Sequence, residues 1–161
     1  MTGSKRDVEG GDAMTEKRPV FNQINLVVRD MAAMVEFYER LGVGLAPTIT
    51  PWDRHHRSFA AESMVDGFDF DLDSVAFATQ WDEGWPRGDG GPVFGFRLAS
   101  PEAVDETFRE LTSAGYVGQQ PPYDGFMGAR YAVVADPDGN AVGLMSPTDP
   151  SRSSIPSPPE A

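Results

Sequence analysis

The chain has 161 residues, no cysteine, and 25 acidic against 13 basic side chains, which gives a formal net charge of -12. This length suits one domain with a real hydrophobic core, and the lack of cysteine excludes disulfides, thiolate metal ligands and a cysteine nucleophile. The acidic balance argues against nucleic acid as a partner, and no apolar run approaches the roughly 20 residues of a membrane helix, so we expect a cytoplasmic protein with no membrane partner.

The two ends of the chain differ in composition from its middle. Residues 1–18 have almost no apolar side chains and are predicted to be a disordered leader, with Met14 as an alternative start. Residues 148–161 are rich in proline and serine and are predicted to be a disordered tail. The predicted domain covers residues 19–147 and holds most of the acidic excess, and every basic residue within it is arginine.

The first half of the domain is predicted to form a strand, a helix and three further strands. Residues 23–28 alternate and are β-branched, which favours a strand. Asp30 is placed to cap a helix over 31–41, whose apolar residues follow helical spacing, and Gly42 is placed to end it. Strand-like segments follow at about 44–50, 56–64 and 68–79, and the turn signal Asp66-Gly67 joins the last two.

The second half repeats this order of elements. Residues 93–98 favour a strand, and Ser100-Pro101 opens a helix over 101–113 that Gly115 is placed to end. Three strand-like segments follow at about 116–120, 129–135 and 140–146, and the turn signal Asp138-Gly139 joins the last two. Chance similarity of two α+β halves is the alternative, but helices and turns align with almost the same offset. We therefore predict an α+β fold of two βαβββ modules, over about 20–80 and 91–147.

The most specific patterns lie in three stretches: INLVVRDMAAMVEFYERLGV (24–43), FGFRLASPEAVDETFRELTSAGY (94–116) and ARYAVVADPDGNAVGLMSP (129–147). With their spacing, they resemble the vicinal oxygen chelate superfamily, which includes glyoxalase I, extradiol dioxygenases and bleomycin-resistance-type proteins. The resemblance implies that both modules form one curved mixed sheet, with helices on its convex face and a ligand pocket on its concave face. It also implies a homodimer.

Metal-dependent members of this superfamily place metal ligands at four strand positions. The resemblance maps these positions onto Gln23 and Asp71 in the first module and onto Val93 and Gly143 in the second. Only Gln23 and Asp71 carry oxygen donors, and a catalytic divalent site usually needs three protein ligands. Since neighbouring strand residues point to opposite faces, at most one of His55 and His56 enters the pocket. We therefore expect no metal cofactor, with Gln23 and Asp71 as weak candidate ligands.

Strand alternation predicts an acidic face in the pocket. Asp69, Asp71 and Asp73 share one face of their strand, opposite Phe68 and Phe70. Either this face is simply solvated, or it is an anionic wall that attracts a cationic ligand, and the two interpretations weigh equally.

Aromatic residues on two loops are predicted to rim the same pocket. Trp52 and the loop 123–130 suit a flat organic ligand, because aromatic walls dominate small-molecule sites. Trp81 and Trp85, in the linker between modules, are expected instead to cover a hydrophobic edge or a dimer interface. The candidate ligand-binding residues are Gln23, Asn25, Trp52, His55, Asp69, Asp71, Arg97, Tyr123, Phe126, Met127 and Arg130.

Three functions are compatible with these features. The leading one is metal-independent binding of a small molecule, an antibiotic or metabolite of cationic or polyaromatic character, as in bleomycin-resistance-type proteins. The second is an enzyme, either a glyoxalase-like lyase/isomerase or dioxygenase with a non-standard metal site, or a metal-free acid–base catalyst with Asp71 or a neighbour as base. The third is a dimeric scaffold without a small ligand.

Overall fold

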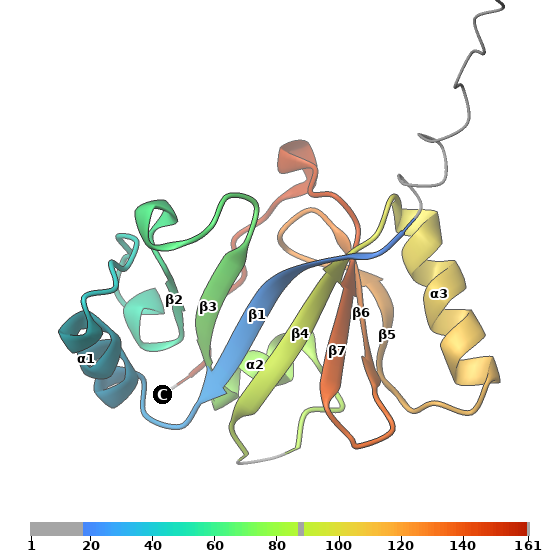
Figure 1. The fold of residues 1–161 in the computed structure, drawn as a ribbon, viewed down its shortest axis with the longest axis horizontal. Coiled ribbons are helices and arrows are strands. Elements are labelled where there is room, and N and C mark those ends of the chain that lie inside the picture. The colour runs from blue at the N-terminus through green and yellow to red at the C-terminus, as the bar shows by residue number, and fades with distance from the viewer. Residues whose placement is uncertain (1–17, 87–88, 161) are drawn as a thin grey trace, which may run out of the picture.

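The computed structural model describes residues 18–86 and 89–160, so the predicted leader lies, apart from Arg18, outside the described residues (Figure 1). Its strands are β1 (Val20–Val28), β2 (His56–Ser58), β3 (Asp69–Ser74), β4 (Gly91–Arg97), β5 (Gly118–Asp124), β6 (Arg130–Ala135) and β7 (Ala141–Met145). Its α-helices are α1 (Met31–Leu41), α2 (Val75–Trp81) and α3 (Pro101–Ser113). Among the helices in these two ranges, none is long and apolar enough to cross a membrane.

The seven strands form one mixed sheet in the order β2-β3-β1-β4-β7-β6-β5. Module one contributes β1, which pairs in parallel with β3, and module two contributes β4, which pairs in parallel with β7. The modules meet where β1 pairs antiparallel with β4. The predicted α+β fold with a curved mixed sheet is therefore confirmed, and the two modules join within a single chain.

The helix boundaries follow the predicted capping residues. The carboxylate of Asp30 accepts a hydrogen bond from the backbone N–H of Ala33 at 3.0 Å, and α1 ends at Gly42, whose φ of 91° suits glycine. Ser100 caps α3 in the same way, accepting from the backbone N–H of Ala103 at 3.2 Å. Side-chain oxygens at these two positions satisfy amide groups that would otherwise lack partners.

Four of the predicted strand segments differ in extent from the structure. The segment 68–79 is a strand only as far as Ser74, whose hydroxyl accepts from the backbone N–H of Phe77 and so begins α2. The segment 44–50 makes only an isolated bridge between Leu45 and Phe59. Residues 56–64 contain only the short strand β2. In module two, β5 continues past the predicted end of 116–120 to Asp124, with irregular register along its proline residues.

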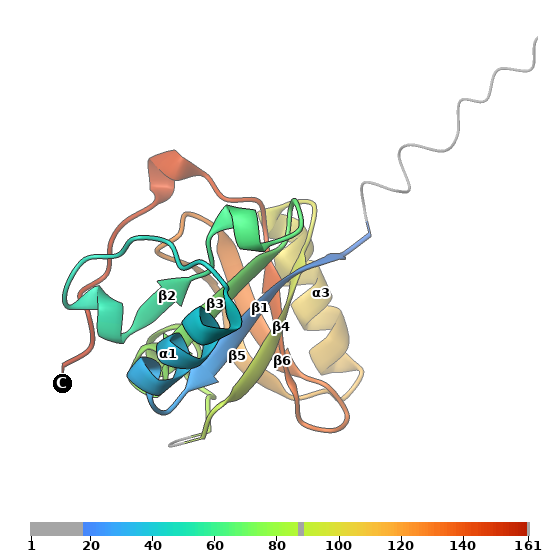
Figure 2. The same ribbon diagram turned by 60° about the vertical axis from the view of Figure 1, so that its left-hand side comes forward.

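Hydrophobic clusters cover both faces of the sheet. On one face, α1 packs on β1 and β3 around Leu72, and α3 packs on β6 and β7 around Val104. Figures 1 and 2 show these two helices at opposite ends of the sheet. On the other face, α2 packs Phe77 and Trp81 near Val93 and Val133. The helix α2 therefore covers part of the face opposite α1 and α3, which the sequence analysis did not predict.

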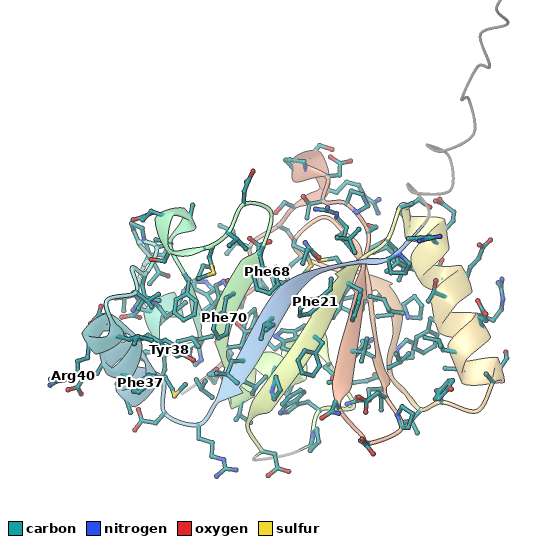
Figure 3. All side chains as sticks on the ribbon, in the orientation of Figure 1. Phe21, Phe37, Tyr38, Arg40, Phe68 and Phe70 are labelled. Carbon is teal, nitrogen blue, oxygen red and sulfur yellow. The ribbon has the colours of Figure 1, made fainter. Side chains whose placement is uncertain are left out.

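Between α1 and α3, the central strands carry partly exposed aromatic residues (Figure 3). Phe21 is 44% exposed, and its ring centroid lies 5.5 Å from that of Phe68 and 5.3 Å from that of Phe96. Since strand neighbours alternate, these rings place Asp69 and Asp71 on the opposite face, as predicted.

Candidate functional site

A cavity of about 620 Å³ lies on the face of the sheet opposite α1 and α3. Strands β1 and β3 supply its acidic side, and α2, β6 and β7 supply its apolar side. The loop 47–52 and the segment 153–156 complete its rim. The cavity therefore draws residues from both modules and from the C-terminal segment.

The acidic side is built from three carboxylates on β3. Asp69, Asp71 and Asp73 all line the cavity, as their alternation predicted. The side-chain amide of Gln23 donates to Asp71 Oδ2 at 3.1 Å, and that of Asn25 donates to Asp73 Oδ2 at 3.1 Å. Among the described residues that line the cavity, none is lysine or arginine. Amides from β1 thus hold the carboxylates in place without neutralising them.

His56 is the basic group at this acidic side. Its Nδ1 lies 2.6 Å from Asp73 Oδ1, and Asp73 is only 1% exposed. Its Nε2 lies 3.1 Å from the hydroxyl of Ser58, which lies on the same strand and the same face. Burial lowers the pKa of His56, but the hydrogen bond and charge of Asp73, with a contribution from Asp71, outweigh it and hold the pKa above its ordinary 6.5.

The other two carboxyl groups on the acidic side, those of Asp69 and Asp71, both have raised pKa values. Burial raises the pKa of Asp71, and the charge of Asp73 raises it further, although His56, Ser58 and Gln23 act in the opposite direction. Burial and the charge of Asp71 likewise raise the pKa of Asp69. A cation in the cavity would relieve this repulsion, because an opposite charge favours the ionised form.

Aromatic rings form the other side of the cavity. The ring of Phe77 lies 5.1 Å from that of Trp52 and 5.6 Å from that of Phe126, and Trp81 lies 6.1 Å from Tyr131. All five rings line the cavity. Burial raises the pKa of Tyr131 well above its ordinary value, so its phenol stays neutral. This side offers π-faces and one neutral hydroxyl to a ligand.

The four positions that the resemblance assigns to metal ligands do not fit a divalent cation. Val93 is 2% exposed within the hydrophobic core, and Gly143 has no side chain. The hydroxyl of Tyr131 fills the space beside Gly143, where an added β-carbon would lie 2.9 Å from it. Within residues 18–86 and 89–160, no group of three or more His, Cys, Asp or Glu side chains is arranged to hold a metal ion.

The structure brings most of the predicted site residues together. Those that line the cavity are Gln23, Asn25, Trp52, Asp69, Asp71, Phe126 and Met127. Four others do not line it: His55, Arg97, Tyr123 and Arg130. His55 is buried with its Nδ1 3.0 Å from Ser74 Oγ, and Arg130 pairs with Asp105 at 2.8 Å. The structure therefore places His56, and not His55, at the cavity, because β2 begins at His56 and directs that side chain to the cavity face.

Several cavity residues were outside the predicted set. These are chiefly His56, Phe77, Trp81, Tyr131 and Met145, with residues 153–156. Trp81 was expected at a hydrophobic edge, but α2 carries it into the cavity, while Trp85 packs in the core beside it. The Ser74 cap was the available signal for α2, since a serine before a run of helix-compatible residues favours a helix start.

Comparisons with known proteins agree with this fold. Residues 20–144 match the Glyoxalase/Bleomycin resistance protein/Dioxygenase superfamily, whereas no curated protein matches. The crystal structure described as NAD-dependent benzaldehyde dehydrogenase from Legionella pneumophila is 22% identical, with a TM-score of 0.55 over 78% of this chain and 97% of that one. A superfamily member from Vibrio splendidus 12B01 is 14% identical, with a TM-score of 0.53 over 81% of this chain and 100% of that one. The Mn(II)-bound glyoxalase from Novosphingobium aromaticivorans is 16% identical, with a TM-score of 0.54 over 78% of this chain but only 38% of that one.

Proposed function

The chain belongs to the Glyoxalase/Bleomycin resistance protein/Dioxygenase superfamily, and from this premise we propose that it binds a small molecule without a metal, in the manner of bleomycin-resistance-type proteins. The ligand is an antibiotic or metabolite that carries a positive charge and an aromatic or apolar body. One observation carries the proposal: a single cavity joins three carboxylates to five aromatic rings and has no lysine or arginine among its described lining residues.

The size of the cavity supports a ligand rather than an ion or water alone. Small-molecule sites typically measure roughly 300–1,000 Å³, and this cavity measures about 620 Å³. Its walls are mostly apolar, with a few polar groups on one side, which is the usual composition of such sites.

The charge of the cavity supports a cationic ligand. Asp69, Asp71 and Asp73 line the cavity against one histidine, so acidic side chains outnumber basic ones among its described lining residues. Aromatic faces add attraction for the same sign of charge, since a cation over a ring gains about 0.5–2 kcal/mol. Both sides of the cavity therefore favour an organic cation.

The donor set supports binding without chelation. Two of the four assigned ligand positions, Val93 and Gly143, hold no side-chain donor atoms. Only the other two positions could therefore contribute ligands to a metal ion. Gln23 and Asp71, which do carry donors, are hydrogen-bonded to each other.

Titration of the full chain with thioflavin T, a flat cationic dye, tests the proposal. The control ligand is its uncharged benzothiazole analogue, which lacks the methyl group on the ring nitrogen. We expect the cation to bind more tightly, and Asp71→Asn to weaken it about tenfold, the equivalent of 1.4 kcal/mol. Asp66→Asn removes the same charge from an exposed turn and should leave affinity unchanged. Equal affinity for both dyes would contradict the cationic ligand, and binding of neither would contradict the small-molecule site.

Acid–base catalysis is a second candidate, favoured by the contact between His56 and Asp73. A buried carboxylate that orients an imidazole inside a cavity is a typical arrangement for general acid–base chemistry. A metabolite extract incubated in D₂O with the wild type or with His56→Gln tests it. Deuterium incorporation or a mass change that needs His56 supports an enzyme, and identical extracts from both proteins support binding alone.

A further inference from the structure

The C-terminal segment 147–160 passes across the cavity instead of leaving the domain. Composition predicts disorder for 148–161, yet residues 148–160 are described and include a short 3₁₀ helix at Pro150–Arg152. Figures 1 and 2 show the chain leading from β7, in module two, back toward β2, in module one. Thr148 and the four residues Ser153–Pro156 line the cavity. The segment is therefore a wall of the candidate site.

Contacts with the loop after β5 hold the first part of this segment. The backbone N–H of Asp149 donates to the carbonyl of Gly128 at 2.9 Å, and that of Ser154 donates to the carbonyl of Phe126 at 2.7 Å. The guanidinium of Arg152 lies 3.1 Å from the carboxylate of Asp124. Three separate contacts thus fix the segment from 149 to 154 against the end of β5 and the loop that follows it, and Phe126 in that loop also lines the cavity.

Gly128 allows this close approach. Its φ is +77°, a conformation that favours glycine, and a β-carbon at this position would collide with the carbonyl oxygen of Asp149. Glycine at position 128 therefore permits the segment to dock here, whereas most other residues at this position would not.

The second part of the segment presents an exposed apolar side chain to the cavity. Ile155 lines the cavity but is 83% exposed, and no backbone N–H beyond Ser154 donates a hydrogen bond within the described residues. Leaving an isoleucine side chain in water forgoes the favourable free energy that its burial would contribute. A ligand with an apolar body would supply the missing contact surface.

We propose that Ile155 is a ligand-binding residue and that the segment 153–156 closes on the apolar body of the ligand while Arg152 and Asp149 anchor it. This inference rests on the proposed function, and it adds a ligand-contacting group that lies outside both βαβββ modules. Since residues 153–156 line the cavity and would contact the bound ligand, these contacts must break before the ligand leaves. The contribution of the segment should therefore be largest in the dissociation rate.

Dissociation of thioflavin T from the full chain, followed by stopped-flow fluorescence, tests this. We expect Ile155→Ser to raise the dissociation rate about fivefold to tenfold. Val65→Ser, at an equally apolar and 75% exposed position that does not line the cavity, should leave it unchanged. Arg152→Ala should also accelerate dissociation, whereas Arg109→Ala on α3 should not. Dye that binds all these variants with equal rates would overturn the role of Ile155 and leave the small-molecule site intact.

A second measurement needs no ligand and separates the two proposals. Because the chain has no cysteine, Ile155→Cys can be labelled uniquely with bimane, a fluorophore that nearby tryptophan quenches. We expect quenching by Trp52 and Trp81, which share the cavity, and recovery of fluorescence when both are changed to phenylalanine. Unquenched bimane in the unaltered cavity would overturn the docked segment even if no dye binds.

Discussion

The sheet strands of the two modules contribute opposite chemistry to one cavity. On the cavity side, module one presents the carboxylates of β3 with the amides of β1, and module two presents Val93, Tyr131 and Met145. On the helix side, the modules are alike, since each packs one amphipathic helix over two strands. The two modules therefore share the same packing on the helix side, whereas their residues on the cavity side differ. This agrees with the rule that function depends on the residues of the site and not on the fold.

One pair of equivalent positions shows this divergence at the level of single residues. Asp71 and Gly143 both lie four residues after a turn glycine and both face the cavity side of a strand parallel to the first strand of their module. Asp71 accepts from Gln23, whereas the hydroxyl of Tyr131 takes the place of a side chain at 143. A carboxylate on one side is matched by an aromatic ring on the other.

Truncation of one core leucine in each module gives the largest expected effect. Leu72→Ala and Leu144→Ala each remove a side chain that is at most 4% exposed, so each should lower the free energy of unfolding by about 3 kcal/mol. Similar losses are expected because the modules are alike on the helix side. Urea denaturation measures both. If one variant loses less than 1 kcal/mol, the packing faces of the modules are not equivalent.

A methyl group at 143 tests how firmly module two excludes a side chain. The β-carbon of Gly143→Ala would lie 2.9 Å from Tyr131 Oη, so we expect a loss of about 2 kcal/mol in stability. Tyr131→Phe removes that oxygen and leaves ring atoms no closer than 3.3 Å, so it should recover part of the loss. A double-mutant cycle by denaturation measures the coupling. Additive effects would show that the Tyr131 ring moves away from the added methyl group at no measurable cost in stability.

The repeat and its helix boundaries were predictable because they depend on local chemistry. Capping at Asp30 and Ser100 and the turns at Gly67 and Gly139 are decided within a few residues, and the structure confirms them. The helix α2 was missed because β-branched and aromatic residues after Ser74 favour a strand until the cap is considered. The serine cap, and not the hydrophobic pattern, marks the start of this helix.

Strand alternation predicted the acidic side of the site, and the composition of two loops predicted part of its aromatic side. Asp69 and Asp71 were placed correctly because a long strand fixes its own faces. A three-residue strand carries no periodic signal that would distinguish His55 from His56. Only the pairing of β2 with β3, in which His56 lies opposite Asp73, determines which histidine faces the cavity. Residues 153–156 were beyond prediction, since a proline- and serine-rich composition says nothing of a docking site elsewhere on the chain.

The linker between the modules contains a buried acid, Asp82. It is 0% exposed and accepts from the backbone N–H of Gly84, and its Oδ2 has no hydrogen-bond partner among the residues that the structure describes. Burial raises the pKa of Asp82 from 3.8 to about 6. The carboxyl thus stabilises the fold fully below about pH 4 and loses that contribution as pH rises through about 6. Asp82→Asn should therefore be about 1 kcal/mol more stable than the wild type at pH 7.5 and equal to it at pH 3.5. Thermal unfolding at both pH values measures this, and an equal or lower stability at pH 7.5 would contradict it.

The smallest expected effect is on the titration of His56, the histidine that lines the acidic side of the cavity. The folded pKa of His56 is raised, chiefly by the hydrogen bond and charge of Asp73 against the opposing effect of burial, and to a lesser degree by Asp71. Its stabilisation is therefore complete below pH 6.5 and is lost as pH rises through the folded value. Asp71→Asn removes the lesser charge while keeping the shape, so it should lower the pKa of His56 by less than Asp73→Asn does. NMR titration of the imidazole protons measures both shifts. An unchanged or higher pKa in Asp73→Asn would mean that the acidic side does not control His56, and the contrast between the modules would then be one of shape without electrostatic consequence.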